Sequence, residues 1–244
     1  MPPKSTAIRE FSSGAKDTIP MMIGAAPFGI IFGALAISGE RALTPSAAMG
    51  MSLIVFAGSA QFIALGLYAQ GIGLPFIVFT TFIVNLRHAL YAASLAPFMR
   101  HLGQRWLAPL GFMLTDETYA VVIRRFHAEG QTPRGQWYYL GSALPFYCNW
   151  QLCTLVGIVA GSQLGDAAAW GLEFAMTVTF IGIVVPLVKS RPMLACALVA
   201  AAASLATASL PNRLGLLVGG LAGIAVGLLI EWAESTRHKR RQLS

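Results

Sequence analysis

The chain has 244 residues, of which 56% are hydrophobic and only 11% are charged, and its mean hydropathy is +0.65. A soluble globular domain carries charge on about a quarter of its residues, so this composition excludes that class and favours a membrane-spanning protein. With 25 glycines, 13 prolines and 3 cysteines, the chain is also neither collagen-like nor a disulfide-rich scaffold.

The net charge is +7, but the basic residues lie between and beyond the apolar runs rather than on one face. This distribution is typical of membrane topology signals, so no nucleic-acid partner is expected. Cys148, Cys153 and Cys196 lie in hydrophobic segments, which favours packing roles over a disulfide framework or a zinc site. We expect neither a metal nor a cofactor.

A helix that crosses the hydrocarbon core needs about 20 apolar residues, because it rises about 1.5 Å per residue across about 30 Å. The pattern predicts an all-α polytopic membrane helix bundle with seven to eight hydrophobic segments: 19–38, 47–69, 74–99, 109–123, 138–161, 171–188, 193–210 and 214–230. The first segment is longer than a secretory h-region and is expected to be retained. We expect three parts: a cytoplasmic segment at 1–18, a single membrane transport domain at 19–234 and a basic cytoplasmic tail at 235–244.

Lys and Arg residues in short loops indicate that both termini are cytoplasmic. The first half of the chain does not fit simple alternation. Arg100 and Arg105 fall in a loop that alternation places outside, whereas the uncharged loop 70–73 would lie inside. Re-entrant or broken helices between 47 and 123 would repair the count, and such backbone occurs at membrane depth only where it is buried in protein or lines a cavity. This region is therefore the candidate functional region.

Asp116 and Glu117 stand in the centre of the segment 109–123. An acidic residue at mid-membrane costs about 2.5 to 3.5 kcal/mol on an insertion scale, so this segment should enter the bilayer only against other helices or a wet cavity. Carboxylates in such places often serve substrate or proton pathways. The alternative is that both residues lie at a water-exposed helix end. Adjacent helical residues point about 100° apart, so the two carboxylates are not expected to share a site.

Asn85, Arg87 and His88 interrupt the segment 74–99. Within the membrane, Arg87 would offer a fixed guanidinium for a substrate carboxylate or for an ion pair with Asp116 or Glu117. His88 could change its charge near neutral pH. The alternative is that these residues form a cytoplasmic turn, in which Arg87 is an ordinary topology signal.

Gly58, Ser59 and Gln61 lie near the middle of the segment 47–69, where they suggest a helix break. A half-helix that begins there would present free N–H groups to an anionic carboxylate; the alternative is close helix packing by small residues. Asn149 in the segment 138–161 is a candidate for the transport path, or for a hydrogen bond between helices. Glu173 is a candidate for proton coupling, or a favourable charge at a helix start.

Motifs of soluble enzymes are absent: the sequence contains no P-loop, G-x-S-x-G, H-E-x-x-H or C-x-x-C. We therefore expect a protein that is not an enzyme.

Five blocks together resemble the AzlC family of branched-chain amino-acid exporters: APFGIIFGALA (26–36), MSLIVFAGSAQF (51–62), TTFIVNLRHALYAASLAP (80–97), MLTDETYAV (113–121) and GLEFAMTVTF (171–180). The resemblance covers roughly 18–230 and departs at Glu173, where the family has Asp. It implies a multi-pass permease of the bacterial cytoplasmic membrane that works with a small hydrophobic AzlD-type subunit. The implied activity is export of valine, leucine, isoleucine and related residues, with methionine as a further candidate, driven by the proton gradient.

The residues and the resemblance together lead to one hypothesis for the site. Gly58, Ser59, Gln61, Asn85, Arg87 and Asn149 would contact substrate or line its path, and His88, Asp116, Glu117 and Glu173 would serve proton coupling or ion pairing. An apolar wall would suit a branched side chain. The competing hypothesis is a non-transporting membrane subunit whose charges serve assembly of a larger complex.

Overall fold

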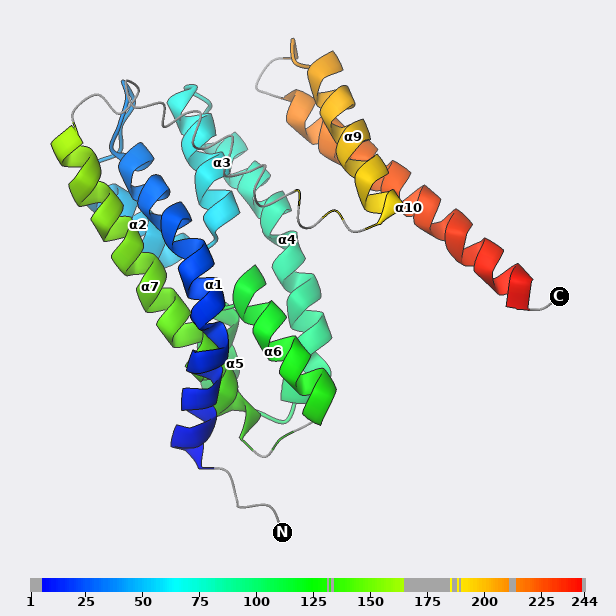
Figure 1. Cartoon of the computed structure of the whole chain (residues 1–244). Coiled ribbons are helices and arrows are strands. Elements are labelled where there is room, and N and C mark those ends of the chain that lie inside the picture. The colour runs from blue at the N-terminus through cyan, green and yellow to red at the C-terminus, as the bar shows by residue number, and fades with distance from the viewer. Residues whose placement is uncertain are drawn as a thin grey trace. The chain divides into compact units, whose positions relative to one another are not determined.

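The computed structural model describes residues 6–130, 132, 134–164, 185, 188, 190–210 and 214–242 (Figure 1). All the regular elements in this part of the chain are helices, which confirms the predicted all-α membrane bundle. The chain divides into two compact units, Met1–Ala175 with helices α1 to α7 and Met176–Ser244 with α9 and α10. The predicted segment 171–188 lies outside the described residues apart from two isolated positions, and so does Glu173.

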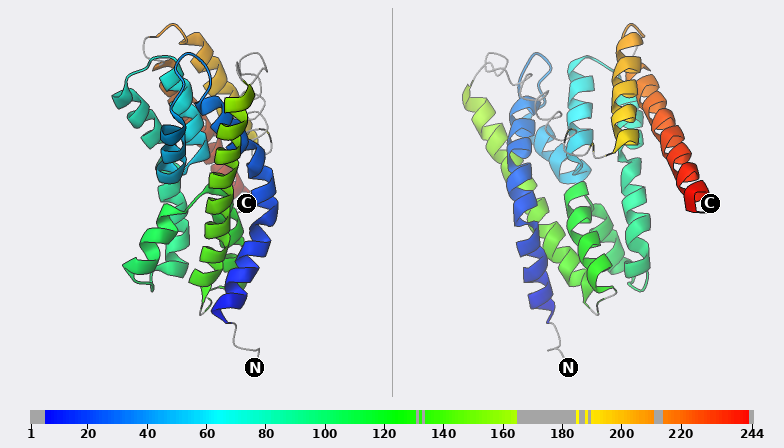
Figure 2. Two further views of the ribbon diagram at one scale, coloured as in Figure 1. Left: turned by 90° about the vertical axis from the view of Figure 1, so that its left-hand side faces the viewer. Right: turned by 45° about the vertical axis from the view of Figure 1, so that its right-hand side comes forward.

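Two long helices, α1 (Ala7–Ala36) and α7 (Gly135–Leu164), pack side by side in every view (Figures 1 and 2). They run parallel, because the hydroxyl of Thr18 donates to that of Ser142 at 2.6 Å and, further along both helices, Gly33 faces the backbone of Thr154. The two backbones touch here, since a Cβ atom added at Gly33 would overlap the carbonyl oxygen of Thr154. Small residues of this kind allow helices to approach closely in lipid.

Helix α1 begins twelve residues before the predicted start at residue 19. Its N-cap is Thr6, whose hydroxyl accepts a hydrogen bond from the backbone N–H of Arg9. The residues 7–18 include both acidic and basic side chains, so a search for long apolar runs did not detect this part of the helix. Such a search finds only the part of a helix that faces lipid. The predicted N-terminal segment 1–18 is therefore largely helical.

The predicted span 47–69 is two short helices, α2 (Pro45–Val55) and α3 (Gly58–Ala69). The break lies at Phe56, whose φ of 41° is left-handed. Beyond the outer ends of the pair, the guanidinium carbon of Arg41 lies 3.4 Å from the position of a Cβ on Gly71, so both ends return to the same side. The pair is a re-entrant hairpin, and the predicted break near Gly58 is confirmed.

Helix α4 (Leu74–Met99) is continuous, so the alternative that Asn85, Arg87 and His88 form a cytoplasmic turn is wrong. The helix starts at the loop beside the open end of the first hairpin. Its far end lies beside the C-terminal part of α6, where the rings of Phe98 and Phe126 are 5.3 Å apart. Helix α4 therefore crosses in the direction opposite to α1 and α7.

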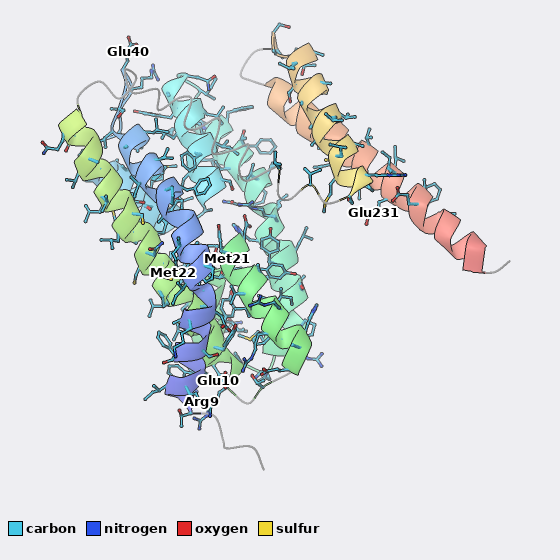
Figure 3. The ribbon with its side chains drawn as sticks, viewed as in Figure 1. Arg9, Glu10, Met21, Met22, Glu40 and Glu231 are labelled. Atoms are coloured by element: carbon cyan, nitrogen blue, oxygen red, sulfur yellow. The ribbon has the colours of Figure 1, made fainter. Side chains whose placement is uncertain are left out.

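The predicted span 109–123 is also broken, into α5 (Gln104–Phe112) and α6 (Asp116–Glu129). Helix α5 ascends beside the start of α7, as the ring contact of 4.9 Å between Trp106 and Trp137 indicates. Helix α6 descends again, and its Arg125 lies 3.8 Å from the carboxylate of Glu10, which Figure 3 labels near the start of α1. This pair is a second re-entrant hairpin, which enters from the end opposite to the first.

The two hairpins explain why Arg100 and Arg105 did not fit a simple alternation of spans. Among the described residues, three helices are long and apolar enough to cross a membrane, namely α1, α4 and α7, rather than the one span per apolar segment that the sequence suggested. The loop that carries Arg100 then lies at the same end as the starts of α1 and α7, where Arg105 lies as well. If the N-terminus is cytoplasmic, as the loop charges predict, both arginines are cytoplasmic too. The expected re-entrant or broken helices between 47 and 123 are confirmed.

The second unit contains an antiparallel pair, α9 (Arg191–Ala206) and α10 (Leu214–Gln242). A glycine at every fourth position of α10 faces α9: a Cβ at Gly215 would meet Thr207, and one at Gly223 would lie 2.7 Å from the carbonyl oxygen of Cys196. Helix α10 continues past the predicted membrane end near residue 230, so the basic tail at 235–244 is helical as far as Gln242.

Cysteine labelling tests the two hairpins and their orientation. In a variant whose native cysteines are replaced by alanine, Gln70→Cys should react with a membrane-impermeant maleimide added outside intact cells. Gln104→Cys should react only after permeabilisation, because the two exposed positions lie at opposite ends of α4. The reverse pattern would contradict the orientation, and labelling of both positions from one side would contradict the fold.

A pair of glycine substitutions tests the contact between α1 and α7. Gly33→Ala should lower the unfolding midpoint in detergent by roughly 5 °C, because overpacking against Thr154 costs about 1 to 3 kcal/mol. Gly24→Ala is the matched control on the same helix, since a Cβ there meets nothing within 4 Å and alanine favours helix. Equal midpoints for the two variants would disprove the close approach.

Candidate functional site

Arg87 of α4 joins the two hairpins. One of its terminal nitrogens donates to the hydroxyl of Ser59 in the first turn of α3, and the other lies 2.8 Å from a carboxylate oxygen of Asp116 in the first turn of α6. The two side chains of the ion pair are 31% and 41% exposed, so the pair is only partly enclosed by protein. Arg87 therefore lies where both re-entrant hairpins begin their second helix.

The N-terminus of α3 lacks a capping side chain. Its N-cap residue is Ala57, which has extended backbone geometry and makes no side-chain cap hydrogen bond. The first intrahelical bond is donated by Gln61 to the carbonyl oxygen of Ala57. The N–H groups of the preceding turn, Gly58 to Ala60, thus have no acceptor within the helix, and the helix dipole makes this end attractive to an anion.

The N-terminus of α6 is built in the opposite way. Thr115 caps it, and Thr115 and Thr118 form a reciprocal capping box. Asp116 and Glu117 add two carboxylates to the first turn, where negative charge is stabilised by the helix dipole. The two helix ends that meet at Arg87 therefore differ: the end of α3 is open to an anion, and the end of α6 already carries acidic groups.

Buried polar atoms without partners gather at the break before α3. Gln61 is fully buried, and neither its amide nitrogen nor its amide oxygen has a hydrogen-bond partner among the described residues. A helical side chain leans toward the N-terminus of its helix, so the side chain of Gln61 covers the turn that Gly58 begins. The ring of Trp150 on α7 lies against Gly58, and its Nε1 is likewise buried without a partner in the described part. Such atoms are costly unless a ligand or water pairs with them.

Aromatic rings surround this polar centre. Phe56 at the tip of the first hairpin lies 6.5 Å from the ring of Phe112 at the tip of the second and 4.7 Å from Tyr147 of α7. Next to the ion pair, one helical turn after Arg87, Tyr91 stacks on Tyr119 with the ring centroids 4.4 Å apart. These rings provide apolar and weakly polar walls beside charged groups.

Several predicted site residues meet in space. Ser59, Arg87 and Asp116 are in direct contact, Gly58 and Gln61 share the first turn of α3, and Glu117 follows Asp116. Both acidic residues begin a helix, as the helix-end alternative held, but this end lies beside Arg87 at the meeting point of the hairpins. His88 lies 5.9 Å from the ring of Tyr91, and the side-chain oxygen of Asn85 is buried without a partner in the described residues.

Asn149 has a different environment. Its amide nitrogen donates to the backbone carbonyl of Met22, labelled on α1 in Figure 3, at 3.1 Å. The side-chain oxygen Oδ1 of Asn149 accepts a hydrogen bond from the thiol of Cys153, with the sulfur 4.0 Å away. This residue thus connects α7 to α1, which corresponds to the packing alternative, whereas Arg87 pairs with residues of the hairpins. Glu173 lies outside the described residues.

Sequence reasoning did not identify Tyr91, Tyr119 or Trp150. Tyr91 lies one helical turn after Arg87, and Tyr119 lies one turn after Asp116, so helical spacing from the charged residues would have found both. Trp150 has no such signal, because only the fold brings it to Gly58. Within the described residues, no group of three or more His, Cys, Asp or Glu side chains is arranged to hold a metal ion.

Three long apolar helices and two opposed hairpins around a charged centre define a multi-pass membrane protein. The chain belongs to the AzlC family, since the family model described as AzlC protein matches residues 20–164. The matched region ends with α7 and includes both hairpins.

Curated relatives agree with this membership. The chain is 28% identical to the inner membrane protein YgaZ of Escherichia coli over 225 residues, which cover 90% of this chain and 88% of that protein. It is 31% identical to an uncharacterized membrane protein of Archaeoglobus fulgidus, covering 74% and 77%. It is 29% identical to the branched-chain amino acid transport protein AzlC of Bacillus subtilis, covering 70% and 65%. No solved structure gives a significant match.

Proposed function

We propose that this chain is the large subunit of a bacterial inner-membrane permease that exports valine, leucine, isoleucine and, as a further candidate, methionine. A small hydrophobic AzlD-type subunit assists it, and the proton gradient drives export. The observation that carries the proposal is the position of Arg87, held between the open N-terminus of α3 and the acidic N-terminus of α6. Membership of the AzlC family and the name of the Bacillus subtilis relative support the substrate class.

The groups around Arg87 match the parts of an amino acid. The N–H groups at Gly58 and the hydroxyl of Ser59 are donors for a carboxylate, with Gln61 above them in the same turn. Asp116 and Glu117 supply negative charge for an ammonium group or for a transported proton. The rings around Phe56 suit a branched apolar side chain. Asn85 and His88 lie on the same helix as Arg87 and complete the proposed polar path, with Asn149 and Glu173 as its outlying members.

The hairpins also suggest how such a site is reached. One hairpin enters from each side of the bundle, and their tips touch through Phe56 and Phe112. In this proposal each hairpin closes the site from its own side, and movement of one hairpin at a time gives alternating access.

One observation favours the alternative, a subunit that serves assembly without moving solute. Helix α4 leaves a broad apolar face uncovered within its unit, since Val78, Phe82 and Leu90 are each more than 60% exposed. Such a face can contact lipid or another membrane helix. A scaffold would keep its function after charge-neutral changes at the site if the complex still assembled, whereas a transporter would assemble and fail to move amino acid.

Efflux from cells tests the proposal. Cells that lack their own exporters are loaded with dipeptides of valine, leucine, isoleucine or lysine, and free amino-acid efflux is measured with and without a co-expressed AzlD-type partner. We expect partner-dependent efflux of the branched residues but not of lysine. Arg87→Gln should reduce efflux at least tenfold, whereas the matched Arg100→Gln, an exposed position at the end of the same helix, should retain it.

Efflux of Arg87→Gln at the wild-type rate would contradict the proposed role of the charged centre. Absence of efflux from a verified, membrane-inserted complex would favour another substrate or the assembly subunit.

Proton coupling is tested in vesicles that contain the purified transporter. Glu117→Gln should abolish the acceleration of leucine transport by an imposed proton gradient, because the amide can neither take up nor release a proton. Glu40→Gln, an exposed change in the loop after α1, is the control and should leave the acceleration unchanged. Unchanged coupling in Glu117→Gln and in Asp116→Asn would contradict an acidic relay.

A further inference from the structure

In the ion pair between Arg87 and Asp116, each partner has one hydrogen-bonding atom that the pair itself does not use. The guanidinium Nε of Arg87 and the Oδ1 of Asp116 are buried, and neither makes a hydrogen bond of good geometry with the described residues, although the hydroxyl of Tyr91 lies close enough to the Asp116 carboxylate to interact with it. The first is a donor on a cation, and the second is an acceptor on an anion. A buried charge with an unused hydrogen-bonding atom is expensive in a membrane protein unless something else pairs with it.

The surroundings of the two atoms have opposite preferences. Arg87 lies beside the hydroxyl of Ser59 and the uncapped N-terminus of α3, which is a setting for an anion. Asp116 lies beside Glu117 in the acidic first turn of α6, which is a setting for a cation. The charge around the ion pair is therefore unevenly distributed: it is positive on the side of α3 and negative on the side of α6.

We infer that this pair selects zwitterions and holds them in one orientation. The carboxylate of the solute replaces Asp116 as the partner of Arg87 at the α3 end, and the ammonium of the solute becomes the partner of Asp116 at the α6 end. Both unused atoms are enclosed in the present conformation, so the solute opens the pair by inserting between its members. The inference rests on the proposed function and adds to it that the solute takes the place of the Arg87–Asp116 ion pair and is held in one orientation.

Charge balance explains the selectivity. A zwitterion exchanges one ion pair for two and leaves the net charge of the site unchanged. A carboxylate without an amino group leaves Asp116 without its cation, and an amine without a carboxylate leaves Arg87 without its anion. In each case one charge of this partly enclosed pair loses its partner, which is unfavourable wherever water does not replace that partner.

Binding of three related molecules tests the inference: leucine, 4-methylpentanoate, which lacks the amino group, and 3-methylbutylamine, which lacks the carboxylate. Affinities are measured by titration calorimetry on the full-length protein in nanodiscs. The wild-type protein should bind leucine at least tenfold more tightly than either single-charge analogue. In Asp116→Asn, leucine should bind at least tenfold more weakly and 4-methylpentanoate at least tenfold more tightly than in the wild-type protein, because Arg87 is then free to take an anion.

Two further variants control this experiment. Asp17→Asn is the matched control, since Asp17 accepts a hydrogen bond from Tyr138 near the start of α7 and should leave the order of the three affinities unchanged. Ser59→Ala removes a neutral partner of Arg87 and should weaken leucine and 4-methylpentanoate by a similar factor without weakening 3-methylbutylamine. This second variant decides the question if Asp116→Asn does not fold.

The outcomes separate the inference from the proposed function. Failure of the wild-type protein to bind leucine would overturn the proposed function, and the inference with it. Binding of leucine together with equal binding of either analogue would overturn the inference alone. So would loss of leucine binding in Asp116→Asn with no gain for 4-methylpentanoate, since Asp116 would then only position Arg87.

Discussion

The close parallel contact between α1 and α7 is the constraint on which the rest of the first unit depends. At Gly33 the two backbones approach so closely that no side chain fits between them, and paired hydroxyls such as Thr18 and Ser142 bridge the same interface. Both hairpins pack against this pair, the first through Ser52 and Thr154 and the second through Leu110 and Tyr139. Interrupted backbone survives at membrane depth only inside protein, and α1 and α7 supply much of that protein environment.

The hairpins bring charge to a place where a continuous helix could not. A helix end carries unpaired N–H groups and a partial positive charge, and two such ends approach Arg87. The two helix N-termini and the guanidinium of Arg87 are all positive and would repel each other. The carboxylates in the first turn of α6 balance this charge. Asp116 is thus important to the fold, because it is the anion that lets Arg87 lie between two helix N-termini.

The sequence alone predicted the membrane class, the outer limits of α4 and the break beside Gly58, since each leaves a local signal in hydropathy or composition. Arg100 and Arg105 indicated an irregular region, because their charges conflict with simple alternation of spans. The second break was not located, because the sequence left open whether Asp116 and Glu117 lie in the middle of a span or at a water-exposed helix end, and only the fold shows that α6 begins there. The hairpin directions and the contact of Trp150 with Gly58 depend on distant segments, so no local pattern encodes them.

The turn of the first hairpin has a mechanical consequence. Phe56 adopts a left-handed conformation that costs a residue with a side chain about 1 to 2 kcal/mol and that glycine would adopt freely. The ring offsets this strain through its contacts with Phe112, Phe146 and Tyr147. The side chain of Phe56 therefore holds the tip of the first hairpin against the second hairpin and against α7. A displacement of one tip on its own must therefore break the ring contact between Phe56 and Phe112.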